Sequence, residues 1–349
     1  MLVHPSFRLN GKAYDRNALD LAAQQWTVSS DEEQQGLGHF LMDWLSDDEH
    51  ITLHTSGSTG KPKEIQMPKT AMYASAVRTA AFFNLSDGDS ALLCLPIRYI
   101  AGKMMLVRAL VLGLHLDIIP PKTKLHIEKN YTFAALIPLQ ANASFDVLGR
   151  FKTVLIGGAP IPTDLRKRIS KKHKHCIETY GMTETLTHVA MRVVSGVAIP
   201  FTAMPGIGIA TDENDCLVLE VAYVPLSPIV TQDVVRREGD DAFSLLGRRD
   251  WVINSGGMKI FPEALEEVLT PFIKFPFFFT ALPDADLGEK LVLLAEAPTT
   301  EKAAIMAIAK QHLGANKYHV PRQVICLDAF VRTHSGKLDR KATIKYLNI

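Results

Sequence analysis

The segment 55–63 concentrates groups that bind phosphate. Its sequence, TSGSTGKPK, combines hydroxyls, two glycines and two lysines. Glycines let backbone N–H groups approach an anion, hydroxyls donate further hydrogen bonds, and lysines supply positive charge. The pattern GxxxxGK[ST] is absent and Pro62 follows the first lysine, so this is not a Walker A loop. A shorter run of this kind would be a mobile Gly/Ser turn, but nine consecutive residues favour a phosphate loop. The candidate ligands are Thr55, Ser56, Gly57, Ser58, Thr59, Gly60, Lys61 and Lys63.

A second candidate site is the sequence YGMTET at 180–185. Thr183 and Glu184 follow an expected strand, and ligands of doubly wound sheets bind beyond strand ends. Glu184 could therefore hold Mg²⁺ against phosphate groups. The alternative is a helix capping box that begins at Thr183.

An alternation of strands and helices must position these residues. From residue 51 onward we expect strands at 51–55, 91–96, 115–119, 153–158 and 175–181, and helices at 69–83, 104–112 and 162–172. Such alternation predicts parallel βα units. After Pro200 the strands become shorter, as in a barrel-like extension. Beyond Asp250 we expect a separate α+β unit with helices at 261–269 and 301–313 and strands at 290–297 and 323–327.

The predicted fold class is therefore α/β with two domains. A chain of 349 residues exceeds the usual size of a single core. We expect a large N-terminal domain, 1–249, with parallel βα layers and the barrel-like extension. A small, mobile α+β domain, 250–349, follows, with a hinge near Asp250.

Composition and charge exclude several classes. Apolar residues make up 47% of the chain and the net charge is +1, so we expect a folded protein with no nucleic-acid partner and no membrane insertion. The apolar window 104–119 is too short and polar for a membrane span, and no targeting segment precedes it. The cysteines are scattered without a CxxC pair, which suits buried thiols in the cytoplasm.

The motifs together resemble the adenylate-forming superfamily of acyl-CoA synthetases, adenylation domains and luciferases. After the phosphate loop come IGGAPIP (156–162), YGMTET (180–185), TQDVV (231–235), the hinge and CoA-side segment (247–266) and RTHSGKLDR (332–340). The resemblance covers 51–345. It implies ATP, Mg²⁺ and coenzyme A as ligands and a small carboxylic acid as substrate.

The resemblance also implies a role for each matching residue. Lys337, Thr183 and Glu184 are the candidate catalytic residues, with Mg²⁺ at Glu184, and Asp233 would bind ribose while Arg248 bonds ribose and phosphate. Taken alone, Asp233 could be a solvated turn acid, Arg248 part of a charged linker, and Lys337 a surface lysine. The remaining candidates are Gly157, Gly158, Ala159, Tyr180 and Gly181 on the nucleotide side and Ser255, Gly256 and Gly257 on the CoA side.

Within the superfamily, the segments 95–110 and 156–162 look most like o-succinylbenzoate:CoA ligases of menaquinone synthesis. That family implies an arginine six residues after a glycine, a spacing that Gly102 and Arg108 satisfy. A dicarboxylic acid needs a second cation. Arg98, Tyr99, Lys103 and Arg108 are therefore the candidate acid-binding residues. Alternatively, Arg108 is a helix-surface arginine.

Some features depart from the family pattern. Arg98 and Tyr99 replace an aromatic-His pair, TGD has become TQD, and the phosphate loop lies early, which implies an abbreviated N-terminal subdomain. A carrier-loading adenylation domain and a non-catalytic nucleotide-binding protein remain alternatives, and a homodimer is compatible with the resemblance. The basic run 166–175 is expected to be a solvated helix end. His173 and His175 should face apart and form no metal pair.

Overall fold

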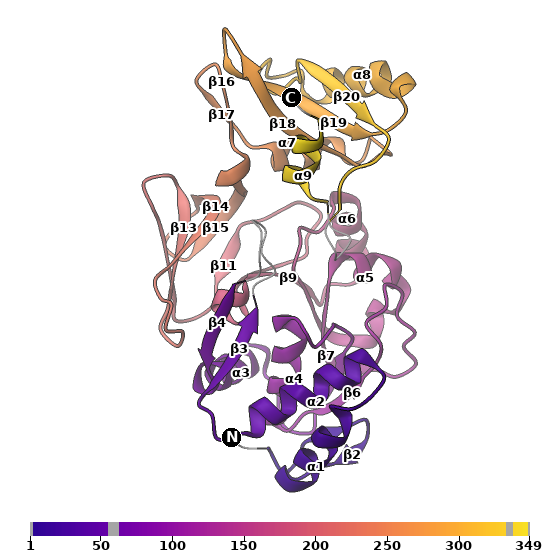
Figure 1. The fold of residues 1–349 in the computed structure, drawn as a ribbon, viewed down its shortest axis with the longest axis vertical. Coiled ribbons are helices and arrows are strands. Elements are labelled where there is room, and N and C mark those ends of the chain that lie inside the picture. Colours follow the sequence, from indigo (N-terminus) through magenta and orange to yellow (C-terminus); the bar gives the residue numbers. More distant parts are fainter. Residues whose placement is uncertain (1–2, 55–62, 333–337, 348–349) are drawn as a thin grey trace.

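The computed structural model describes residues 3–54, 63–332 and 338–347 (Figure 1). Its centre is a parallel sheet in the order β9-β8-β7-β5-β6. These strands are β5 (Ser90–Leu93), β6 (His115–Ile118), β7 (Tyr131–Leu136), β8 (Phe151–Ile156) and β9 (Cys176–Gly181). β6 lies beside β5 on one side, whereas β8 and β9 extend beyond β7 on the other. The strand order therefore reverses between β5 and β7, and such a switch point is where open α/β sheets bind ligands.

Helices cover both faces of this sheet, as the α/β prediction requires. On one face lie α1 (Arg16–Trp26), α2 (Glu32–Leu45), α3 (Lys69–Phe83) and α4 (Ile100–Leu112), whose apolar side chains share one core. On the other face lie α5 (Pro138–Ala143), the 3₁₀ helix η1 (Phe145–Arg150) and α6 (Thr163–Lys172), which enclose a second core. α4 is apolar almost all round and is buried from Met104 to Leu110, as expected for a helix with no solvent face.

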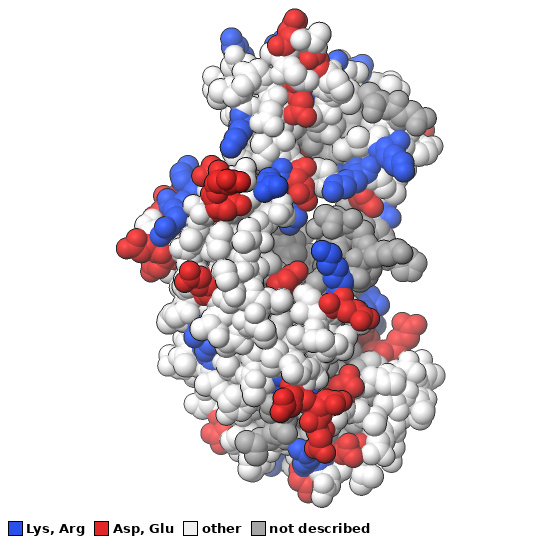
Figure 2. Space-filling model, turned by 60° about the vertical axis from the view of Figure 1, so that its left-hand side comes forward, with Lys and Arg blue, Asp and Glu red and all other residues white. Residues whose placement is uncertain are grey.

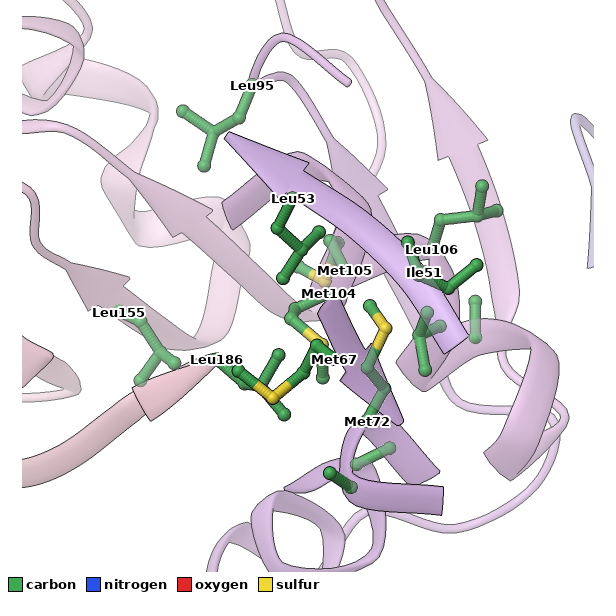
Figure 3. Close-up of a cluster of buried hydrophobic side chains, with 14 of the residues drawn as sticks. Ile51, Leu53, Met67, Met72, Leu95, Met104, Met105, Leu106, Leu155 and Leu186 are labelled. Atoms are coloured by element: carbon green, nitrogen blue, oxygen red, sulfur yellow. The ribbon is translucent and has the colours of Figure 1, made fainter. Parts of the chain in front are cut away.

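The expectation that the strand near residue 51 begins the parallel alternation is wrong. β3 (His50–His54) pairs antiparallel with β4 (Glu64–Pro68), a strand that we did not predict, in a separate two-stranded sheet. This hairpin borders the segment 55–62. Ile51, Leu53 and Met67 pack with Met104 and Met105 of α4 in one cluster (Figure 3). The hairpin is therefore anchored to the large core through its apolar face.

The strands that follow β9, most of them after residue 200, are antiparallel and continue the large sheet. They are β10 (His188–Val193), β11 (Phe201–Ala203), β12 (Ile207–Thr211), β13 (Cys216–Val221), β14 (Ile229–Arg237) and β15 (Ala242–Arg248). At the opposite edge, β1 (Arg8–Leu9) and β2 (Lys12–Ala13) follow β6. Among the described residues, this sheet therefore has 13 strands. β15 leads to the short 3₁₀ helix η3 (Arg249–Trp251).

A second sheet follows η3 and has its own core. Its strands are β16 (Ile253–Ser255), β17 (Met258–Ile260), β18 (Phe277–Asp284), β19 (Gly288–Glu296) and β20 (Gln323–Leu327). α7 (Pro262–Leu269), η4 (Thr299–Glu301) and α8 (Lys302–Leu313) lie along it, and α9 (Arg340–Tyr346) ends the described chain. This part lies above the larger one in Figure 1. The Oγ1 atom of Thr163 at the start of α6 donates to Glu267 Oε1 of α7 at 3.2 Å, so the two parts touch here.

Three sequence interpretations of individual side chains need correction. α6 ends at Lys172, so His173 and His175 lie outside the helix, and their ring centroids are 5.7 Å apart rather than facing apart. The basic run is not uniformly solvated, because Arg166 is buried with an exposed fraction of 2%. Cys94, Cys176 and Cys216 are buried as expected, but Cys326 is only partly buried.

Candidate active site

The carboxyl edge of the parallel sheet gathers most of the described candidate residues. The segment that includes Arg98 follows β5, Gly157 and Gly158 follow β8, and Glu184 follows β9. Because β5, β7, β8 and β9 are neighbouring parallel strands, these loops emerge at the same edge. A hollow of about 370 Å³ lined by Ser90 and Arg150 lies at the opposite, amino edge, away from these loops.

Close backbone packing explains the glycines of these loops. A Cβ atom on Gly157 would lie 2.4 Å from Thr179 Oγ1, and one on Gly181 would lie 2.3 Å from the carbonyl oxygen of Thr187. Gly158 has φ +80°, a conformation that other residues rarely adopt. Ala159 is exposed beside them. These positions therefore favour small residues on structural grounds, and they leave the backbone at the edge accessible.

Thr183 and Glu184 do not begin an α-helix. They lie in the 3₁₀ turn η2 (Thr183–Thr185), whose N-cap is Met182, so the capping-box alternative that starts at Thr183 is wrong. Both side chains are partly exposed. Mg²⁺ typically binds one or two carboxylates together with phosphate oxygens and water. No group of three or more acidic, His or Cys ligands occurs among the described residues.

Tyr180, Asp233, Arg248 and Asp250 form one polar cluster. The Tyr180 hydroxyl donates to Asp233 Oδ2 at 2.5 Å, while Arg248 Nη1 lies 3.5 Å from Asp233 Oδ1 and Arg248 Nη2 lies 3.3 Å from Asp250 Oδ2. Burial, and then the Asp233 carboxylate, raises the pKa of Tyr180 well above its ordinary value, so the phenol stays protonated and donates. Asp233 lies within β14 and Arg248 within β15, so neither is a turn acid or a linker residue.

The structure thus brings together three candidates that are far apart in the sequence. Asp233 and Arg248 are register partners on neighbouring antiparallel strands, whereas Tyr180 comes from β9. The Nε atom of Arg248 is buried and has no hydrogen-bond partner. The cluster therefore offers a carboxylate, a phenol and a guanidinium within reach of a polar ligand. Side chains of both charge signs lie across the middle of the molecule (Figure 2).

A buried charge triad that the sequence did not suggest supports the β8–α6 loop. Glu178 Oε2 lies 2.7 Å from both Arg166 Nη2 and Arg192 Nε. Its other oxygen accepts from the backbone N–H of Ile161 at 3.4 Å. Arg166 and Glu178 are 2% and 3% exposed. Because Ile161 closes the loop that begins at Gly157, the triad fixes this loop to β9.

Arg108 is buried, so the helix-surface alternative is wrong. It is 3% exposed, and its Nη2 donates to Thr187 Oγ1 at 2.5 Å, while its Nε has no partner. Burial lowers the pKa of Arg108 to about 10, which still leaves it charged at neutral pH. His188 lies beside Thr187, and burial, together with the Arg108 charge, holds the pKa of His188 well below its ordinary value. A neutral imidazole thus stands next to a buried cation.

The other three acid-side candidates do not join Arg108. Lys103 lies on α4 five residues earlier, which turns it about 140° away around the helix. Its ammonium group lies 5.4 Å from the centre of the Phe40 ring on α2. Arg98 stacks over the neighbouring Tyr99, and both are exposed where α4 begins. Among the four candidates, Arg108 alone occupies the interior position that a buried carboxylate requires.

The CoA-side candidates form a tight turn. Ser255 ends β16 opposite Met258 of β17, and Gly256 and Gly257 connect them with φ +57° and +78°. Two central residues with positive φ are typical of a type I′ hairpin, which favours glycine. Ser255 is buried, with an exposed fraction of 3%. The turn lies on the smaller part of the molecule.

Lys337 and the candidates from Thr55 to Lys61 lie outside the described residues. Lys63 is described, is exposed and directly precedes β4. Beyond Lys337, Arg340 of α9 lies 2.6 Å from Glu266 of α7, and its guanidinium faces the Trp251 ring at 5.6 Å. α9 is therefore tied to both α7 and η3.

Sequence reasoning missed the residues that hold these candidates in place: Arg166, Glu178, Arg192, Thr187 and His188. Glu178 and His188 lie close to the YGMTET segment in the sequence, which could have made them candidates. The sequence did not indicate which side chains they contact. In the described ranges, no helix combines the length and apolar character needed to cross a membrane.

Comparisons with known proteins confirm the family resemblance. Residues 11–230 match the family model described as AMP-binding enzyme. The chain is 28% identical over 345 residues to the "Probable 2-succinylbenzoate--CoA ligase" of Mycobacterium tuberculosis, which covers 86% of this chain and 85% of that protein. It is 25% identical to the 2-succinylbenzoate–CoA ligase of Bacillus mycoides over 86% and 71% of the two chains.

Two solved structures are also similar. One is an acyl-CoA synthetase (AMP-forming)/AMP-acid ligase II-like protein from Dyadobacter fermentans, with a TM-score of 0.59 and 32% identity over 94% of this chain and 98% of that one. The other is the o-succinylbenzoate CoA synthetase of Bacillus subtilis with its acyl-adenylate intermediate, with a TM-score of 0.69. It is 20% identical over 83% and 68% of the two chains, so this likeness concerns the fold alone.

Proposed function

This chain belongs to the AMP-binding enzyme family and is an AMP-forming acid–CoA ligase, and we propose that its acid is o-succinylbenzoate, in menaquinone biosynthesis. The named ligases among its relatives and the buried cation at Arg108 support this choice of acid. ATP, Mg²⁺ and coenzyme A would be the other ligands.

The cluster of Tyr180, Asp233 and Arg248 carries the nucleotide part of the proposal. Asp233 can accept hydrogen bonds from ribose hydroxyls, and Arg248 brings a guanidinium with a buried, unpartnered Nε. The loop at 157–159, in which Gly157 packs closely on Thr179 and Gly158 has φ +80°, would lie beside the base. A nucleotide with its base beside this loop and its ribose at Asp233 would direct its phosphates toward Glu184, and we also assign phosphate binding to the segment 55–63 from its residue types.

In the first half-reaction a carboxylate oxygen of the acid attacks the α-phosphorus of ATP. The new P–O bond forms as the bond to the β-phosphate breaks, and pyrophosphate leaves. Negative charge gathers on the α-phosphate oxygens, and we assign its stabilisation to Lys337 and Arg248. Glu184 would hold Mg²⁺, which supplies charge neutralisation at the phosphates.

In the second half-reaction the thiolate of coenzyme A attacks the carbonyl carbon of the acyl-adenylate. The C–S bond forms, the C–O bond to AMP breaks, and AMP leaves with the electron pair. We propose that the smaller part of the molecule turns about Asp250 between the two steps, so that Lys337 withdraws and the Gly256–Gly257 turn faces the acyl group. A turn without side chains leaves space for a narrow thiol passage.

Arg108 would recognise the carboxylate of the acid that is not activated. A buried guanidinium with an unpartnered Nε can offer that N–H to a carboxylate, and Thr187 already orders its Nη2. The neutral His188 beside it can donate or accept one further hydrogen bond. Fatty acids lack the second carboxylate and would leave this cation unpaired, which is costly.

ATP–pyrophosphate exchange across a small panel of acids tests the proposal. We expect exchange with o-succinylbenzoate and little with fatty or amino acids. Lys337→Ala should slow exchange far more than thioester formation from supplied acyl-adenylate. Preference for another acid would refute the choice of substrate, and equal loss in both steps would refute the role of Lys337.

A further inference from the structure

One face of α2 lies against the segment that carries the acid-side candidates. Glu33, Gly36 and Phe40 are three and four residues apart and therefore share a helix face. Glu33 and Gly36 contact Ile97, and Phe40 faces Lys103. α2 thus meets the loop after β5 and the first turn of α4.

Glu33 makes a directional contact from this face. Its Oε2 accepts from the backbone N–H of Ile97 at 3.0 Å, across 64 residues of sequence. Ile97 lies inside a turn in which the N–H of Tyr99 donates to the carbonyl oxygen of Pro96 at 3.2 Å. A charge-assisted bond to a backbone N–H fixes a turn more firmly than apolar packing does.

Two close approaches leave this turn little freedom. A Cβ atom on Gly36 would lie 2.9 Å from Ile97 Cγ2, and one on Gly102 would lie 2.4 Å from the carbonyl oxygen of Pro96. The turn is therefore held between α2 and α4. Where it sits depends on where α2 holds Ile97.

We propose that Glu33 is a positioning residue for acid recognition, because its bond to Ile97 sets the turn that packs against Gly102 of α4, the helix that carries Arg108. The inference rests on the proposed function, since it assumes that Arg108 binds the acid. We assign Glu33 no contact with the acid or the nucleotide, because its carboxylate accepts from the backbone of Ile97. It acts through the backbone of 96–99, so its removal should weaken binding of the acid and leave binding of ATP unchanged.

Glu32 supplies a matched control. Both glutamates lie in the first turn of α2, where negative charge stabilises the helix N-terminus. Glu32 is exposed, whereas Glu33 is partly buried against Ile97. An effect of charge at the helix end would be the same in Glu32→Ala and Glu33→Ala, but an effect on the turn belongs to Glu33 alone.

The experiment compares Glu33→Ala, Glu33→Gln and Glu32→Ala with the unmodified chain. In pyrophosphate exchange, Glu33→Ala should raise the KM for the acid about five- to tenfold with the KM for ATP unchanged. Glu33→Gln should restore most of the affinity, because its amide oxygen can still accept from Ile97. Hydrogen exchange should show faster exchange of the Ile97 amide in Glu33→Ala and normal exchange in Glu32→Ala.

Equal KM values in Glu33→Ala and Glu32→Ala, or a parallel rise in the KM for ATP, would overturn the inference. So would an unchanged Ile97 amide in Glu33→Ala. Absence of exchange with o-succinylbenzoate in the unmodified chain would instead refute the proposed substrate. In that case the variants are compared with the acid of the panel that does support exchange, so the two failures remain distinct.

Discussion

Removing the buried carboxylate of Glu178 should destabilise the larger part of the molecule strongly. Glu178 lies 2.7 Å from both Arg166 and Arg192 and is 3% exposed. Glu178→Ala leaves two guanidinium groups beside one another, with Arg166 only 2% exposed and two of its nitrogens already without partners. Breaking a buried ion pair on one side costs about 3–5 kcal/mol. For a unit of this size we expect the Tm to fall by roughly 10 °C.

Comparing the loss of stability in three variants tests this explanation better than a single Tm does. Arg166→Met leaves Glu178 paired with Arg192, so it should cost much less than Glu178→Ala. Glu238→Ala, which breaks an exposed pair with Arg236, should leave the stability nearly unchanged. Thermal and urea unfolding measure all three. If Arg166→Met destabilised as much as Glu178→Ala, uncompensated buried charge would not be the cause.

Four further outcomes follow from the site. Tyr180→Phe should raise the KM for ATP about fivefold in pyrophosphate exchange, because Asp233 loses its phenol donor; an unchanged KM would exclude Asp233 from ribose binding. Arg108→Met should raise the KM for o-succinylbenzoate about a hundredfold without lowering the Tm, because it also removes a buried cation. Burial lowers the pKa of His188, so the imidazole is protonated in the unfolded chain before it is in the folded one, and the folded state loses stability as the pH falls below about 6.5. In His188→Gln, the free energy of unfolding measured with urea should therefore depend less on pH between pH 7 and 5. Burial raises the pKa of Glu263, so the protonated carboxyl group stabilises the folded state at low pH, and this contribution is lost as the pH rises through the folded pKa. Glu263→Gln should therefore raise the Tm at pH 7 but not at pH 4.

Long, strongly patterned elements were predictable from the sequence. The helix expected at 69–83 is α3, and the core helix and strand expected within 104–119 are α4 and β6. β4 was missed, because a short strand that leads straight into a helix leaves no periodic pattern of its own. β7 and β18 were missed as well. Each of these strands is stabilised by hydrogen bonds to neighbouring strands, which come from other parts of the sequence.

The sequence alone determined the order of the motifs and hence the family, because a phosphate loop, an acidic turn and a lysine segment are local patterns that residue types specify directly. Only the tertiary structure decided which charges are buried and which are paired. Arg108 meets Thr187 across 79 residues, Tyr180 meets Asp233 across 53, and Glu33 meets Ile97 across 64. Such contacts arise where strands and helices from distant segments pack together, and the energy of a charge depends on that packing. The sequence was therefore compatible with Arg108 either on the helix surface or in a buried site, and only the tertiary structure shows that it is buried.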